Sequence, residues 1–217
     1  MSKDWKDYFD KKANTHGESV KSSDYFDDAS FFTQRTNILN WLGNISNKEI
    51  LDAGCGVGAF SEPLTAMNKV YGVDFSAKSL EFANKRGLIT KVGDLSNLEF
   101  ESNKFDIIVC IGVIQLIENY KPIISELVRV LKPGGTLLIQ TLHKQSIQRQ
   151  LVCLVEQNKK FDKMYTMDEL KSLYKELGLD DIKFLKQYHP FKTITSSDDF
   201  AITDFLCTSF SIKGIKK

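Results

Sequence analysis

The chain has 217 residues, of which 42% are apolar and 26% charged, and this is enough material for one soluble domain with its own core. A formal net charge of +1 lacks the positive excess that a phosphate backbone requires, so it favours a small-molecule substrate over nucleic acid. No stretch approaches the roughly 20 apolar residues of a membrane span, and the four scattered cysteines form no C-x-x-C pair. We therefore expect a cytoplasmic protein with no membrane span and no metal site; the oligomeric state stays open.

The first 45 residues predict two helices. Trp5, Tyr8 and Phe9 form an aromatic stripe on a short helix, and the apolar residues of 29–42 recur at helical spacing. The second segment is expected to pack on the core. The first either docks to bury its aromatic side chains or forms a lid over a ligand pocket.

From about residue 48, short β-branched runs alternate with amphipathic segments, which is typical of a parallel sheet covered by helices. Ser76 is placed to cap one of these helices, and Gly87 to end it. The predicted strands are 48–54, 69–75, 88–95, 105–113 and 135–142, and the predicted helices between them are 58–67, 76–86 and 120–131.

The C-terminal part predicts further helices and a strand pair. A polar helix is expected at 144–160, and a second at 166–179 begins with a capping box of Thr166 and Glu169. Two strands then end the sheet as an antiparallel pair. We interpret residues 1–217 as one domain, with an N-terminal helical segment (1–45), a ligand-binding core (46–143) and a C-terminal segment (144–217).

Three glycines follow the first strand of this core in the stretch EILDAGCGVGAF. Gly54, Gly56 and Gly58 let the backbone approach a ligand closely at the carboxyl end of the strand, which indicates a nucleotide-type site. With Ala59, the same letters satisfy the dehydrogenase spacing G-x-G-x-x-G/A. The glycine turn alone therefore does not choose between a dinucleotide and another adenosine ligand.

Three carboxylates are predicted to meet at the same edge of the sheet. Asp52 lies within the first strand, Asp74 ends the second, and Asp94 follows the third. A carboxylate at the end of the second strand suits a ribose diol, and acidic neighbours favour a cationic ligand over a pyrophosphate. For Asp94, an ordinary turn aspartate is an equally good interpretation.

At this point the sequence resembles the class I S-adenosylmethionine-dependent methyltransferases of the type 11 kind, in the small-molecule branch that includes ubiquinone-pathway and sugar methyltransferases. EILDAGCGVGAF resembles their first motif and YGVDFS their acidic second, and similar segments follow in the family's order to residue 141. The resemblance implies a Rossmann-like α/β three-layer sandwich. Its sheet would be seven-stranded and mostly parallel, with the last strand antiparallel.

The resemblance also implies a set of residues around S-adenosylmethionine as co-substrate. Asp52 would lie near the amino-acid part, Asp74 would hold the ribose hydroxyls, and Phe75 would flank the adenine. The remaining implied contacts are Gly54, Gly56 and Gly58 facing the ligand, Asp94 and Leu95 at the adenine edge, and Ile111 and Gly112 near the methionine part.

One departure from the family concerns the base. Relatives often carry a histidine just after the fourth strand, where this chain has Gln115, and a glutamine cannot remove a proton. His143 is the leading substitute, ahead of His16 and His189, and no catalytic residue is assigned. Phe31, Phe32, Phe191 and Phe200 come from segments that could wall an apolar substrate pocket.

The expected function is methyl transfer to a small molecule, with oxygen a better candidate acceptor than nitrogen. Two alternatives remain open at this point. One is a nicotinamide-dependent Rossmann oxidoreductase, and the other is a protein that binds S-adenosylmethionine without catalysis.

Overall fold

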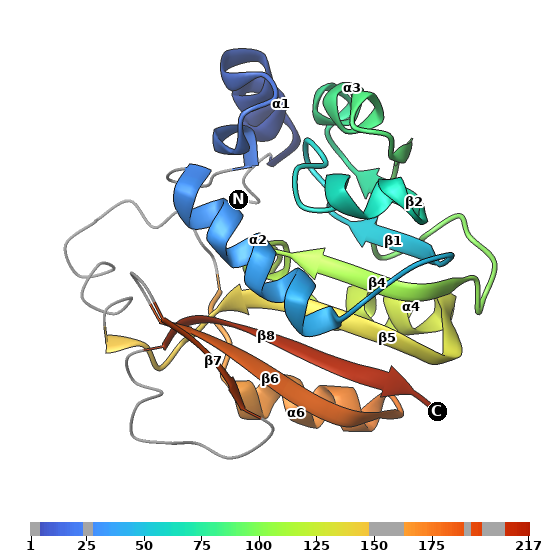
Figure 1. Ribbon diagram of the computed structural model, residues 1–217, viewed down its shortest axis with the longest axis vertical. Coiled ribbons are helices and arrows are strands. Elements are labelled where there is room, and N and C mark those ends of the chain that lie inside the picture. The colour runs from blue at the N-terminus through green and yellow to red at the C-terminus, as the bar shows by residue number, and fades with distance from the viewer. Residues whose placement is uncertain (1–4, 24–27, 148–162, 189–191, 197–206) are drawn as a thin grey trace.

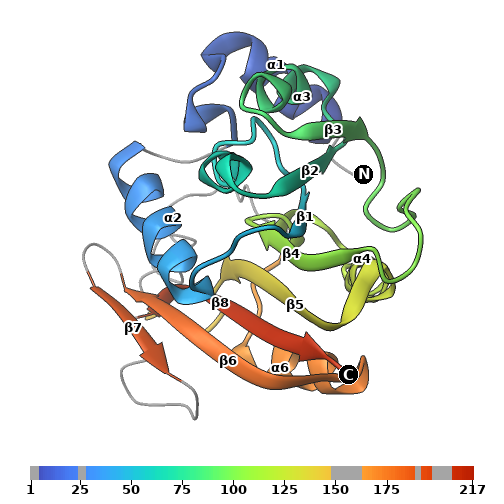
Figure 2. The ribbon, with the colours of Figure 1, turned by 45° about the vertical axis from the view of Figure 1, so that its right-hand side comes forward.

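The computed structural model describes residues 5–23, 28–147, 163–188, 192–196 and 207–217 (Figure 1). In this part of the chain, a sheet of eight strands runs through the molecule in the order β3-β2-β1-β4-β5-β8-β6-β7. Figure 2 shows β3 and β7 at opposite edges of the sheet. The strands are β1 Glu49–Ala53, β2 Lys69–Asp74, β3 Ile89–Val92, β4 Phe105–Ile111, β5 Leu131–Leu142, β6 Leu179–Tyr188, β7 Lys192–Ser196 and β8 Cys207–Lys216.

The strand directions confirm the predicted fold class. The pairs β1–β2, β2–β3, β1–β4 and β4–β5 are parallel, whereas β8 runs antiparallel to both β5 and β6. The predicted C-terminal pair is thus β6 and β8. One strand was not predicted: β7 pairs antiparallel with β6 and extends the seven-stranded arrangement at its edge. It is only five residues long and follows Pro190 closely, so its sequence gives a weak strand signal.

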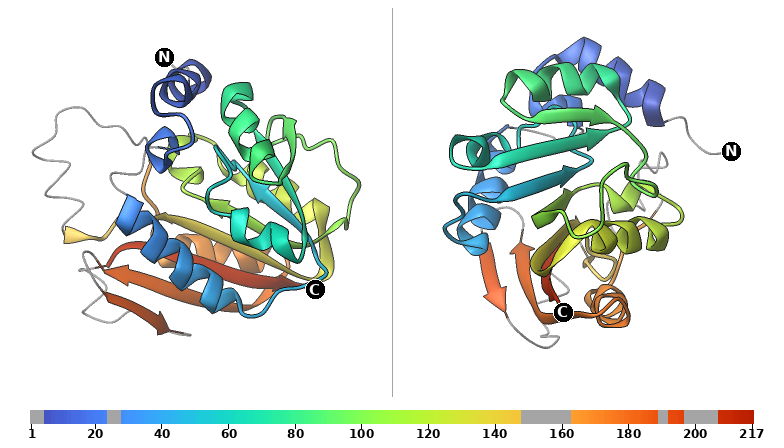
Figure 3. Two further views of the ribbon diagram at one scale, coloured as in Figure 1. Left: turned by 45° about the horizontal axis from the view of Figure 1, so that its top comes forward. Right: turned by 90° about the vertical axis from the view of Figure 1, so that its right-hand side faces the viewer.

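Helices cover both faces of the sheet, which gives the three layers visible in Figure 3. On one face, α2 (Asp28–Leu42), the 3₁₀ helix η2 (Glu62–Ala66) and α3 (Ala77–Lys85) share a core with Ile50, Val109 and Leu138. On the other face, α4 (Lys121–Val130) and α6 (Met167–Glu176) pack on Leu51, Ile108 and Ile139. The remaining helices are α1 (Trp5–His16), η1 (Val20–Ser23) and η3 (Ile114–Leu116). None of the helices in the described ranges combines the length and the apolar character needed to cross a bilayer.

Two predicted helix boundaries are confirmed by their caps. The hydroxyl of Ser76 accepts a hydrogen bond from the Ser79 N–H at the start of α3. At the start of α6, Thr166 and Glu169 form the full capping box. Gly87 and Gly178 both have positive φ, as the ends of these helices require.

The prediction of a helix over 58–67 was wrong. Gly58 has φ of +78°, so it cannot take part in a helix, and only the short 3₁₀ helix η2 follows. Fifteen residues separate β1 from β2, from 54 to 68, and the glycine turn uses several of them. The predicted strand at 135–142 also begins earlier, because β5 includes Pro133 and the next two glycines in an irregular stretch. The predicted helix at 144–160 lies almost entirely outside the described residues.

Candidate functional site

The glycine turn follows β1 at its carboxyl end. Each of its three positions requires glycine for a different physical reason. A Cβ on Gly54 would lie 2.3 Å from Cγ2 of Val113, and one on Gly58 would lie 2.9 Å from Cα of Ala83 in α3. Gly56 has positive φ and donates its N–H to Oδ2 of Asp74 at 2.9 Å. The turn is therefore packed against the end of β4, against α3 and against the end of β2.

Asp74 lies at the centre of this arrangement and is 8% exposed. Its Oδ2 accepts from Gly56, and its Oδ1 accepts from the Ser76 N–H at 2.9 Å. Burial raises the pKa of Asp74, and these hydrogen bonds partly offset the rise. A carboxylate offers about four lone-pair sites, so each oxygen can still accept a further hydrogen bond from a ligand.

Asp52, on β1, has less support from the protein. It is 1% exposed, and its Oδ2 has no hydrogen bond from any described residue. Burial raises its pKa to about 7; the nearby Ser61 hydroxyl lowers it, and the charge of Asp74 raises it further. The Ser61 Oγ is itself buried and without a hydrogen bond to described residues. Such a carboxylate is suited to a ligand that brings a positive charge or hydrogen-bond donors.

A pocket opens beside these residues and joins several segments. Phe31 of α2 and Val20 of η1 form one side of it, and Asp52 and Ile111 at the ends of β1 and β4 form another. The glycine turn completes the lining with Gly54, Cys55, Ala59 and Phe60. The pocket thus has apolar walls and one buried carboxylate. Of the predicted site residues, it brings together Asp52, Gly54 and Ile111.

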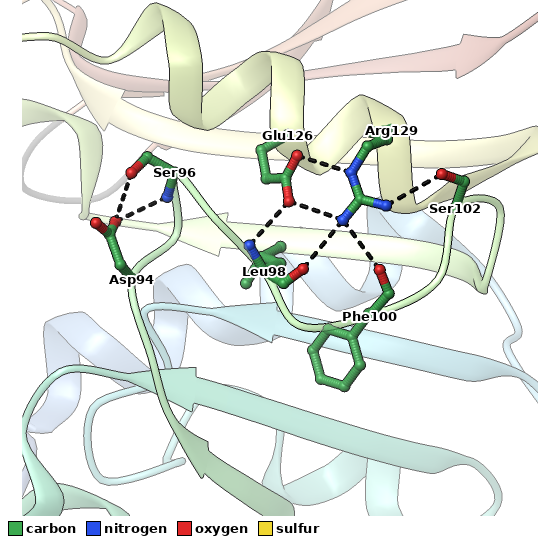
Figure 4. A network of polar contacts seen from close by, with 7 residues as sticks. All are labelled: Asp94, Ser96, Leu98, Phe100, Ser102, Glu126 and Arg129. Atoms are coloured by element: carbon green, nitrogen blue, oxygen red, sulfur yellow. Dashed lines mark hydrogen bonds and ion pairs between the residues drawn. The ribbon is translucent and has the colours of Figure 1, made fainter.

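The other predicted site residues lie around this pocket. Phe75 follows Asp74 and is 37% exposed, and Gly112 follows Ile111 with positive φ and donates to the Gln140 carbonyl at 3.1 Å. Leu95 is buried. Asp94 is exposed, and its Oδ1 accepts from both the N–H and the hydroxyl of Ser96, at 2.8 Å each (Figure 4). The turn interpretation of Asp94 therefore has direct structural support.

An ion pair between Glu126 and Arg129 holds the segment that follows Asp94. Glu126 of α4 accepts from the Leu98 N–H and binds Arg129, whose guanidinium donates to the carbonyls of Leu98 and Phe100 and to the hydroxyl of Ser102 (Figure 4). This network fixes the segment between β3 and β4 to α4. It lies outside the pocket, so we assign it a structural role.

The N-terminal helix packs over the second-strand side of the site. The Ser76 hydroxyl donates to Oδ1 of Asp10 in α1, and the rings of Phe9 and Phe75 lie 5.9 Å apart. Figures 1 and 2 both show α1 next to α3. The predicted aromatic stripe therefore reaches the site through Phe9.

Two arginines that no sequence motif marks as site residues hold the glycine turn. Arg35 of α2 donates to the Ala59 carbonyl at 2.7 Å. Arg86 donates to the Val57 carbonyl at 3.0 Å and to the Glu18 carbonyl at 2.8 Å, and it pairs with Glu62. Both arginines act on backbone carbonyls, and a sequence pattern does not reveal such contacts.

Of the candidate bases, the two that the structure describes, His143 and His16, do not line the pocket. His143 is 0% exposed, its Nδ1 lies 3.3 Å from the Cys207 carbonyl, and its ring packs edge-on to Phe210. Gln115 is buried and accepts from the Thr141 hydroxyl at 3.1 Å. His16 is exposed at the end of α1, and His189, Phe191 and Phe200 lie outside the described residues. The expectation that a substrate reaches His143 is not supported by this burial.

Comparisons with known proteins identify the family. A family model described as a methyltransferase domain matches residues 51–139, which contain the glycine turn, Asp74 and the end of β4. Residues 51–139 therefore belong to the methyltransferase-domain family, and the chain has the class I methyltransferase fold. S-adenosylmethionine is therefore the co-substrate of this methyltransferase.

Two relatives and one solved structure illustrate the range of the family. The methyltransferase is 33% identical to a ubiquinone biosynthesis O-methyltransferase of Rickettsia canadensis over 113 residues, covering 49% of this chain and 48% of the relative. It is 30% identical to a tRNA U34 carboxymethyltransferase of Nautilia profundicola over 164 residues, covering 70% of this chain and 54% of the relative. The chain thus spans about half the length of these relatives.

The structural comparison confirms the fold. The magnesium protoporphyrin IX methyltransferase of Synechocystis, solved with bound S-adenosylhomocysteine, superposes with a TM-score of 0.71. The match covers 98% of both chains at 19% sequence identity, and at that identity it shows the fold alone.

Proposed function

We propose that this methyltransferase transfers the methyl group of S-adenosylmethionine to a small-molecule acceptor, with oxygen a better candidate than nitrogen. The observation that carries the proposal is the pocket beside the glycine turn. Val20 and Phe31 close it from the N-terminal side, and both are buried. The apolar walls of this pocket suit a small organic acceptor better than a polyanionic polymer. The name of the O-methyltransferase relative points the same way.

The residues present fit the co-substrate. The unpaired, buried Oδ2 of Asp52 suits the ammonium of the methionine part, and the remaining acceptor sites of Asp74 suit the two ribose hydroxyls. We assign Phe75 and Leu95 to the adenine side, Ile111 and Gly112 to the methionine side, and the three glycines to the close approach of the backbone. Asp94 is proposed at the adenine edge through its loop, because its Oδ1 is used in a turn.

When bound, S-adenosylmethionine supplies an electrophilic methyl group, and the protein's contribution is to align the acceptor with it and to exclude water. The apolar side chains of Val20, Phe31 and Ile111 perform the second task. No histidine lines the pocket within the described part of the chain, so a phenol, which loses its proton far more readily than an aliphatic alcohol, fits this site better than an alcohol.

A second candidate is a tRNA acceptor, favoured by the carboxymethyltransferase relative. The net charge of +1 argues against it, since binding to a phosphate backbone needs an excess of lysine and arginine. The nicotinamide alternative has lost its support, because the family that matches uses S-adenosylmethionine.

The test combines binding and transfer. The full chain should bind S-adenosylhomocysteine and not NADH in a calorimetric titration. With radiolabelled S-adenosylmethionine, label should appear in a low-molecular-weight metabolite fraction and not in tRNA or protein. Label in tRNA would favour the second candidate. Binding without any transfer would indicate a protein that holds the nucleoside without catalysis.

A further inference from the structure

A row of neutral polar side chains begins beside the pocket and runs along the α2 face of the sheet. Ile111, which lines the pocket, is in register with Gln140 of β5, and Gln140 is in register with Ser211 of β8. Ser209, two residues along β8 on the same face, is in register with Gln187 of β6. These four buried residues, together with Gln34 of α2, are called the polar strip below.

Gln187 is held firmly at one end of its amide and is unpaired at the other. Its Oε1 accepts from Gln34 Nε2 at 3.0 Å and from the Ser209 hydroxyl at 2.8 Å. Its Nε2 is buried and has no hydrogen bond to any described residue, although the whole residue is only 8% exposed. A donor aimed in a fixed direction without a partner is uncommon in a protein interior and calls for a ligand.

Ser211 has the same property on the neighbouring strand. It is 0% exposed, and its Oγ also lacks a hydrogen bond within the described part of the chain. Ser211 and Gln187 lie diagonally across the antiparallel pair of β8 and β6, on one face. One ligand could therefore form hydrogen bonds with both Gln187 Nε2 and Ser211 Oγ.

The polar strip carries no formal charge, and this limits the kind of ligand. Two cations on this face have partners elsewhere among the described residues, since Arg35 donates to the Ala59 carbonyl and Lys213 to the Trp41 carbonyl. A charged acceptor would have to leave water without gaining a countercharge here. A neutral group with an oxygen atom would instead satisfy the amide donor of Gln187.

The position of the polar strip fits the pocket. Phe31 of α2 lines the pocket, and Gln34, one turn farther along the same helix, contacts Gln187. Figure 1 shows α2 crossing over the sheet on the β5 and β8 side. A ligand on the polar strip would therefore lie under α2 and beside the methionine end of the pocket.

We propose that the polar strip orients the methyl acceptor, and that Gln187 selects a neutral acceptor by donating its Nε2 hydrogens to an acceptor oxygen. The inference rests on the proposed function and narrows its acceptor to an uncharged, oxygen-bearing molecule. Gln187 is in this sense a specificity residue.

The experiment measures binding of three simple probes to the full chain saturated with S-adenosylhomocysteine. Phenol is the neutral probe, and benzoate and benzylammonium are the charged ones; saturation-transfer NMR gives their relative affinities. We expect phenol to bind in preference to both ions. Gln187→Leu should weaken phenol binding by about tenfold, the effect of one lost hydrogen bond, and leave the affinity for S-adenosylhomocysteine unchanged.

A second variant separates specificity from folding. Gln187→Glu keeps the acceptor for Gln34 and Ser209 but replaces the free donor with an anionic oxygen, so preference should move from phenol to benzylammonium. A merely structural role would not reverse the preference. The control Asn84→Leu removes an exposed amide on α3 and should change neither probe.

Several outcomes would overturn the inference. These are phenol failing to bind, phenol binding equally to wild type and Gln187→Leu, or a crystal with both ligands showing only an ordered water at Nε2. If wild type does not bind S-adenosylhomocysteine, the proposed function itself fails. If wild type binds S-adenosylhomocysteine but the Gln187 variants have unchanged affinities for the probes, the proposed function stands and only the role of Gln187 is contradicted.

Discussion

Aspartates at the two ends of the parallel strands have pKa values shifted in opposite directions. At the amino end, Asp106 of β4 accepts from the Glu49 N–H at 2.9 Å and from Lys132 at 3.0 Å. Partial burial raises the pKa of Asp106, but these two partners lower it more, and the net result is a lowered pKa. At the carboxyl end, burial dominates, and the pKa of Asp52 rises to about 7.

This difference between the aspartates indicates which end of the strands binds a ligand. The carboxylate of Asp106 at the amino end already has a hydrogen-bond donor and a cation from the protein, so it needs no ligand. Asp52 keeps an unpaired oxygen, and Asp74 keeps free acceptor sites. A buried carboxylate without a cation is costly unless something else completes it. The carboxyl end is therefore complete only when a ligand is present.

The largest effect should come from Gly58→Ala. The new Cβ would lie 2.9 Å from the Cα of Ala83 at φ of +78°, so we expect a loss of about 2–4 kcal/mol in the free energy of unfolding. Urea denaturation measures it. Gly134→Ala, at the amino end, is the matched control: its φ is +75° with open space around it, so only backbone strain of about 1 kcal/mol should appear. Equal losses would show that contact with α3 is unimportant.

Substituting the carboxylates should separate binding from stability. Asp74→Ala removes the acceptor proposed for the ribose hydroxyls and should weaken S-adenosylhomocysteine binding by about 1–3 kcal/mol, measured by calorimetry. Asp106→Ala should leave binding unchanged and lower the free energy of unfolding by about 1 kcal/mol. A weakened affinity in Asp106→Ala would break the distinction between the two ends.

The pH dependence should reveal Asp52. Its pKa is about 7 in the folded protein and about 4 in an unfolded chain, so the folded form binds the proton more tightly between these values. Stability should therefore fall as pH rises through this window, by at most about 1.4 kcal/mol per pH unit, and stay level above it. Asp52→Asn should remove the decline in urea denaturation.

Ligand binding should show the opposite trend with pH. Because an ammonium group needs the ionised carboxylate, affinity for S-adenosylhomocysteine should increase as pH rises towards about 7 in wild type. The increase should be absent in Asp52→Asn. An identical pH profile in the two proteins would remove Asp52 from the ligand site.

The smallest effect concerns the N-terminal helix. Asp10→Ala removes the acceptor of the Ser76 hydroxyl and should loosen α1 by about 0.5–1 kcal/mol, seen as faster amide hydrogen exchange in α1. Lys11→Ala, at an exposed position of the same helix, is the control. Unchanged exchange in Asp10→Ala would mean that this hydrogen bond does not hold α1.

The sequence was sufficient for features that depend on local residues. The glycine turn and Asp74 lie within 25 residues of each other, and strand order brings them together. The caps at Ser76 and Thr166 were predicted for the same reason. The prediction over 58–67 failed because a positive φ at Gly58 competed with a helical pattern.

Long-range register could not be predicted in this way. The polar strip exists because β5, β8 and β6 align Gln140, Ser211, Ser209 and Gln187 on one face, and nothing in any single segment marks them. The burial of His143 likewise depends on β8, which contributes Cys207 and Phe210 from 60 residues or more away.

Arg86 binds three separate segments, and this couples their motions. One guanidinium joins the carbonyl of Glu18, just before η1, to the carbonyl of Val57 in the glycine turn and to the carboxylate of Glu62. If the first twenty residues leave the rest of the protein, the bond between Arg86 and the Glu18 carbonyl must break. We therefore expect detachment of that segment to loosen the glycine turn, because both are held by the same guanidinium.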